Sequence, residues 1–136
     1  MPLNTAPIYS GAPIVNWGTI ATANTAKDGT GTVVTVFTAD AVNGGRVEKL
    51  KVRAQSTNTA TVLRVFINNG ATNATAANNS LYAEVTVPAT TATEVAAQTD
   101  LEVPLGLSLP PGYKLNITIG TTVAAGLAVT AVGGKY

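Results

Sequence analysis

The chain has 136 residues, of which 46% are hydrophobic and 11% charged, so it is long enough for one folded domain and too apolar to be disordered throughout. Its net charge of +1 lacks the basic excess typical of a nucleic-acid-binding protein. The absence of cysteine and histidine excludes disulfides, thiolate chemistry and imidazole metal ligands, and it removes the commonest general base of enzymes.

The first 20 residues differ from the rest because three prolines interrupt them. Proline lacks a backbone N–H, so this stretch is predicted to be extended and irregular. It still carries apolar side chains that need a surface, among them Ile14 and Trp17. We therefore predict an extended N-terminal arm over residues 1–20, packed either on its own sheet edge or on a neighbouring molecule, and a folded domain over residues 21–136. The start of the chain lacks the features of a secretory signal, and no apolar run is long enough to span a membrane.

From about residue 30 onward, apolar and polar residues alternate with a period of two, as expected of strands with one buried face. The predicted strands are 32–38, 46–54, 61–67, 81–87, 101–105, 115–119 and 127–131. Pro104 interrupts one of them and favours an edge position for it. Seven or eight short strands without a convincing helix predict an all-β protein, an antiparallel β-sandwich that is jelly-roll-like.

Basic residues gather on one predicted strand, where Lys49, Lys51 and Arg53 alternate with apolar residues. A hairpin with the following strand would place Arg64 opposite Lys51 on the same face. Like charges directly opposite each other are unfavourable unless something offsets them. Glu84 is one candidate for that role and an acidic partner surface is another. The face is therefore either a solvated sheet surface or a docking surface.

The acidic residues give no firm catalytic pattern. Asp100 and Glu102 lie two apart on one strand face, where they either form a Ca²⁺ or acid–base pair or keep an edge strand from pairing with other chains. The sequence contains no Gly-x-Ser-x-Gly motif or phosphate-binding loop. We therefore expect no enzyme activity, no metal and no cofactor.

Three segments carry a family resemblance. Residues 29–38 read Gly-Thr-Gly-Thr-Val-Val-Thr-Val-Phe-Thr, residues 62–70 read Val-Leu-Arg-Val-Phe-Ile-Asn-Asn-Gly, and residues 109–115 read Leu-Pro-Pro-Gly-Tyr-Lys-Leu. Together they resemble small virion proteins of tailed phages and prophages, such as head-decoration components with β-sandwich folds. The resemblance spans about residues 18–134 and its motifs are structural. It implies attachment to a particle as a symmetric oligomer, and no catalytic residues.

These observations favour a capsid decoration or cement protein that is assembled in the host cytoplasm and located on the head surface. The expected partners are the major capsid protein or other virion proteins and further copies of the chain, with no nucleic acid and no membrane. A tail or fibre component, a carbohydrate-binding module and an enzyme are the alternatives, in that order. The residues predicted to bind a partner are Ile14, Trp17, Lys49, Lys51, Arg53 and Arg64.

Overall fold

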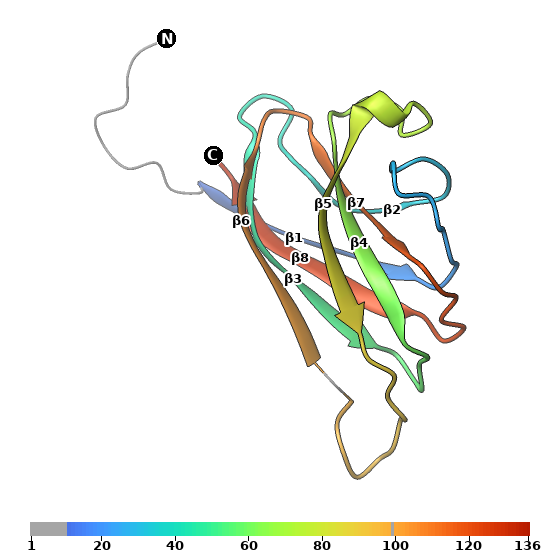
Figure 1. The fold of residues 1–136 in the computed structure, drawn as a ribbon. Coiled ribbons are helices and arrows are strands. Elements are labelled where there is room, and N and C mark those ends of the chain that lie inside the picture. Colours follow the sequence, from blue (N-terminus) through green and yellow to red (C-terminus); the bar gives the residue numbers. More distant parts are fainter. Residues whose placement is uncertain (1–10, 99) are drawn as a thin grey trace.

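A computed structural model describes residues 11–98 and 100–136, which form two four-stranded antiparallel sheets packed face to face (Figure 1). Sheet A has the strand order β1-β8-β3-β6, and sheet B has the order β2-β7-β4-β5. The prediction of an all-β antiparallel sandwich is therefore confirmed, and eight strands are present in the described residues. No helix in this part of the chain is long and apolar enough to cross a membrane.

The strands are short and follow one another through turns. Their bounds are β1 Ala12–Ile20, β2 Val34–Thr38, β3 Gly45–Ala54, β4 Thr61–Asn68, β5 Asn79–Val87, β6 Asp100–Leu109, β7 Lys114–Ile119 and β8 Leu127–Lys135. A single 3₁₀ turn, Ala76–Asn78, precedes β5 in the described residues. Seven of the eight strands overlap the seven runs of alternating residues that the sequence shows, because that alternation places one side of each strand in the core.

The core lies between the two sheets and is built from the inward residues of both. Leu50 and Val52 of β3 and Leu63 and Val65 of β4 are at most 1% exposed. Phe66 is also fully buried, but it is not part of this core cluster. Alternation from Val65 puts it on the outer face of sheet B, where Asn68 and Asn116 are buried as well.

The outer face of sheet B is covered at one end by two loops that asparagine side chains hold together. Asn73, in the β4–β5 loop, donates from Nδ2 to the carbonyl oxygens of Gly29 and Gly31 at 3.1 and 2.8 Å. Asn79 donates to the carbonyl oxygen of Asp28 at 3.1 Å. These bonds tie the β1–β2 loop to the β4–β5 loop, so backbone groups that lie outside the ladders are satisfied by side chains.

The predicted N-terminal arm needs a correction. Ala12–Ile20 is strand β1, and each of its residues is a register partner of one in β8 at the edge of sheet A. That part of the arm therefore belongs to the sandwich. It packs on the edge of the chain's own sheet, which was one of the two surfaces considered for it. Proline is tolerated on an edge strand, so Pro13 does not prevent pairing. Residues 1–10 lie outside the described part of the chain.

The predicted hairpin between strands 46–54 and 61–67 is also wrong. Strands β3 and β4 follow each other in sequence but belong to different sheets. Asn58 in the connecting segment is 4% exposed, and it donates from Nδ2 to the carbonyl oxygens of Thr59 and Pro88 at 3.0 Å each. The connection therefore crosses from one sheet to the other, and Lys51 does not lie opposite Arg64.

Strand β6 is an edge strand, as Pro104 predicted, but the proline does not end it. The strand continues through a register shift against β3, close to Gly106, whose φ is +54°. Glycine adopts positive φ without steric cost, so the strand can bulge there and resume pairing.

Candidate docking face

The outer face of sheet A brings together residues from all four of its strands. In the register of the sheet Trp17 of β1 lies beside Thr130 of β8, which lies beside Lys51 of β3, which lies beside Glu102 of β6. The next row places Val15, Val132 and Lys49 side by side in the same way. The aromatic candidate and the basic candidates of the sequence therefore share one face.

The part of this face formed by β1 and β8 is apolar and exposed. Trp17 is 68% exposed and Val15 is 54% exposed, although both are large hydrophobic residues. Their register partners on β8, Thr130 and Val132, are half-buried and extend the same surface across the neighbouring strand. An exposed tryptophan next to a second apolar side chain is the composition expected at the centre of a protein interface.

Ile14, the other apolar candidate, lies on the opposite side of β1 from Trp17. It is half-buried and packs against the core between the sheets. Ile14 therefore stabilises the fold rather than offering a contact to a partner. Val15 is the residue that the sequence analysis missed; the alternation of Ile14 inward and Val15 outward would have identified it if residues 12–20 had been interpreted as a strand.

The part of the face formed by β3 and β6 is charged and carries two ion pairs. Lys49 Nζ lies 3.0 Å from Glu102 Oε1, and Lys51 Nζ lies 3.0 Å from Asp100 Oδ2. All four side chains are 40–51% exposed, so each pair contributes little to stability. Arg53 is exposed on the same face, in register with Asp100.

Arg64 does not belong to this face. It lies on sheet B, where its Nε donates to Glu84 Oε1 at 2.8 Å. Glu84 thus supplies the intramolecular offset that the sequence suggested. The predicted face of four cations is therefore divided: Lys49 and Lys51 form ion pairs on sheet A, Arg53 is exposed beside them, and Arg64 forms a separate pair on sheet B.

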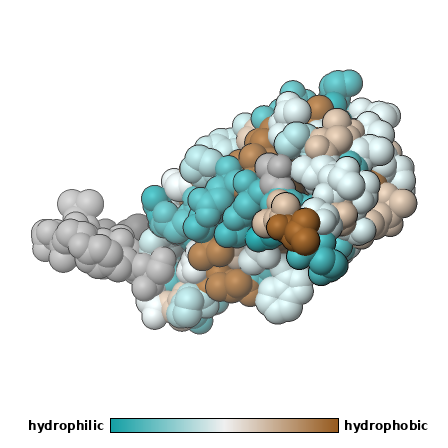
Figure 2. All heavy atoms as spheres, turned by 90° about the horizontal axis from the view of Figure 1, so that it is seen from below, coloured by the Kyte–Doolittle hydropathy of each residue, from teal (hydrophilic) through white to brown (hydrophobic). Residues whose placement is uncertain are grey.

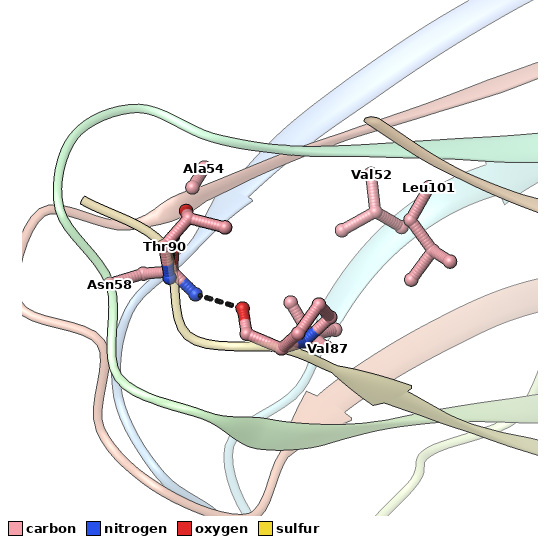
Figure 3. Close-up of a pocket in the computed structure, with 7 residues that line it drawn as sticks. Val52, Ala54, Asn58, Val87, Thr90 and Leu101 are labelled. Carbon is pink, nitrogen blue, oxygen red and sulfur yellow. Dashed lines mark hydrogen bonds between the residues drawn. The ribbon is translucent and has the colours of Figure 1, made fainter. Parts of the chain in front are cut away.

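A cavity between the two sheets, near Asn58, is too small to hold a ligand (Figure 3). This cavity has a volume of about 10 Å³, which corresponds to about one water molecule. In the close-up, the Asn58 amide donates across it toward Pro88, while Val52 and Leu101 form its apolar wall. Its size excludes a substrate or cofactor.

The acidic residues of the described part of the chain form no group of three potential metal ligands, and two of them, Asp28 and Asp40, bind nearby turns. Asp28 accepts from the Thr30 hydroxyl at 2.6 Å and from the Thr30 N–H, and these bonds lower its pKa below the ordinary value. The backbone N–H groups of Asn43 and Val42 lower the pKa of Asp40 in the same way. Both carboxylates stabilise turns, because a hydrogen bond to the charged form favours it.

The end of the sandwich that carries the β5–β6 loop shows a mostly pale or hydrophilic surface with separate small hydrophobic patches (Figure 2). Val95, in that loop, is 93% exposed. A single exposed side chain at a loop tip is ordinary for a protein surface. The outer face of sheet A, where two large exposed apolar residues lie on one side of the same strand, is the stronger candidate for docking.

Comparison of the chain with protein families, with curated proteins and with solved structures finds no match. The function is therefore inferred from the residues and geometry of the molecule.

Proposed function

We propose that this protein is a structural component of a virion, a capsid decoration or cement protein that binds the head surface through the outer face of sheet A. The observation that carries the proposal is the placement of exposed Trp17 and Val15 beside the charged pairs of Lys49 and Lys51 on one face of a sheet. An aromatic anchor with a charged rim is the usual composition of a protein interface.

The connectivity of the strands supports the same proposal. We infer a jelly roll, because the orders β1-β8-β3-β6 and β2-β7-β4-β5 interleave two antiparallel sheets as two Greek keys do. Jelly rolls are common among viral capsid domains, although lectins and other binding proteins also use them. The fold supports the proposal only by analogy, and the main support comes from the exposed face of sheet A.

Binding through many copies fits the charge pattern of this face. Since the ion pairs are exposed and internally balanced, they give orientation and solubility more than affinity. Affinity for a partner then comes from Trp17 and Val15, and it is multiplied when many copies bind one lattice. We propose that the protein acts as a homo-oligomer on the major capsid protein or another virion protein, by binding and not by catalysis.

The aromatic side chains do not favour the carbohydrate-binding alternative. Trp17 is in β1 of sheet A, whereas Tyr82 is in β5, the edge strand of sheet B that lies at the end of the strand order away from β2. Tyr113 packs against the core, and the Tyr136 hydroxyl lies 2.7 Å from Ser108 Oγ. A sugar-stacking platform needs adjacent aromatic faces, and these four residues are dispersed.

The experiment is density-gradient purification of particles from a lysate of the bacterial host that carries the gene, followed by quantitative mass spectrometry of each fraction. We expect the chain in the particle fraction, in a fixed and high ratio to the major capsid protein. A head-binding protein stays with purified tail-less heads, whereas a tail or fibre component leaves with the tails. Recovery of the chain only in the soluble fraction would refute the proposal.

A further inference from the structure

Arg64 is bonded through only a small part of its guanidinium. Its side chain is 11% exposed in the middle of β4, and its Nε donates to Glu84 Oε1. Arginine binds a carboxylate most strongly through two parallel N–H···O bonds. In the described residues, the contact with Glu84 uses one nitrogen, so the terminal nitrogens remain free to donate to another acceptor.

Two buried polar atoms at this point have no hydrogen-bond partner within the described part of the chain. They are Nη1 of Arg64 and Oγ1 of Thr118. The two residues are register partners on the adjacent strands β4 and β7. An unpaired buried polar group is costly, and a charged one more so, so an acceptor from outside the chain is expected here.

A surface hollow of about 370 Å³ opens beside the guanidinium. Gly120 lines the hollow and has no side chain to fill it. A Cβ atom at this position would lie 3.4 Å from Arg64 Nη1. The lining includes three threonines, and Arg64 is its single charged residue. The residues that line it are Ala60, Thr61, Val62, Arg64, Thr86, Gly120 and Thr121.

We propose that this hollow binds the carboxylate group of a small organic acid. A planar carboxylate matches the terminal nitrogens of the guanidinium, and it supplies the acceptor that Nη1 lacks. Glu84 already places one negative charge beside Arg64, so a monoanion is favoured over a dianion such as hydrogen phosphate. The hollow is larger than one carboxylate needs, which accommodates an amino-acid or sugar-acid skeleton. The site lies on sheet B and does not depend on the proposed docking through sheet A.

The test is an NMR titration of the full chain with sodium acetate, compared with sodium chloride at equal ionic strength. We expect saturable shifts of the Arg64 Nε–H signal and of the Gly120 amide up to about 100 mM acetate, since a ligand of few atoms binds weakly. N-acetylglutamine and glucuronate, which are both monoanions, are titrated separately and identify the preferred skeleton by which of them binds more tightly than acetate. Arg64→Gln should abolish these shifts.

Arg46→Gln is the matched control, because Arg46 is an arginine on the other sheet that also pairs with a neighbouring carboxylate, Glu48, at 2.5 Å. It should leave acetate binding unchanged. Gly120→Ala keeps the charge of Arg64 and narrows the hollow, so it should weaken binding about tenfold even if Arg64→Gln does not fold. Identical, unsaturable shifts with acetate and chloride would mean that water completes these bonds and would overturn the proposal. So would tighter binding of phosphate than of any carboxylate.

Discussion

Replacing Trp17 with alanine separates docking from folding. The Trp17 residue is 68% exposed. If its full area is about 250 Å², about 170 Å² is available to a partner, and burial at about 25 cal/mol per Å² gives at most about 4 kcal/mol. Ordering costs reduce this value, so we expect Trp17→Ala to weaken docking by about 2–4 kcal/mol, or roughly 30- to 1,000-fold. The free energy of unfolding should fall by less than about 1 kcal/mol, since the tryptophan has few partners to lose.

The assay is cosedimentation of the purified protein with particles from which its gene has been deleted, together with thermal melting of each variant. Val42→Ala is the control, because Val42 is 80% exposed but lies in the β2–β3 connection, outside the docking face. It should bind like the unmodified protein. Docking of Trp17→Ala at unchanged affinity would refute the assignment of this face, and a large drop in its melting temperature would mean that Trp17 serves the fold.

Three further predictions concern the fold itself. Leu63→Ala, at a fully buried position, should lower the free energy of unfolding by about 2–5 kcal/mol in urea titrations, whereas an unchanged value would mean that the core is misplaced. Gly133→Ala should destabilise the protein by about 1–3 kcal/mol or more, because its Cβ would overlap the Arg46 carbonyl oxygen; a neutral result would contradict the close approach of β8 to β3. Asp40 has a lowered pKa, so its contribution to stability is present at neutral pH and is lost as the pH falls through its folded-state pKa. Asp40→Ala should therefore lower the melting temperature at about pH 7 and have little effect at about pH 2. Equal effects at both pH values would exclude that role for the carboxylate.

The alternation of apolar and polar residues predicts most of this fold, and its failures have physical reasons. Strand β1 was missed because Pro13 and Gly18 are unfavourable in strands. Both fit here only through tertiary context: β1 is an edge strand, and a Cβ on Gly18 would lie 2.5 Å from Val34 Cγ1 of the facing sheet. Local residue preferences carry no information about such a close approach.

Strand partners are harder to derive than strands. Lys51 and Arg64 both point outward, as predicted, but their strands are consecutive in sequence and were expected to share one sheet. The structure separates them, and Lys51 pairs with Asp100 while Arg64 pairs with Glu84. Which strands share a sheet depends on contacts between residues far apart in sequence. The placement of Trp17 on the same face as Lys51 could therefore be found only from the structure.

The most direct test of the proposed function is cryo-electron microscopy of the purified particle at a resolution that shows strands. The account predicts density for the sandwich on the outside of the head, with the outer face of sheet A toward the capsid shell and Trp17 buried at the contact. Absence of the sandwich from the head, or attachment through sheet B with Trp17 facing solvent, would contradict it.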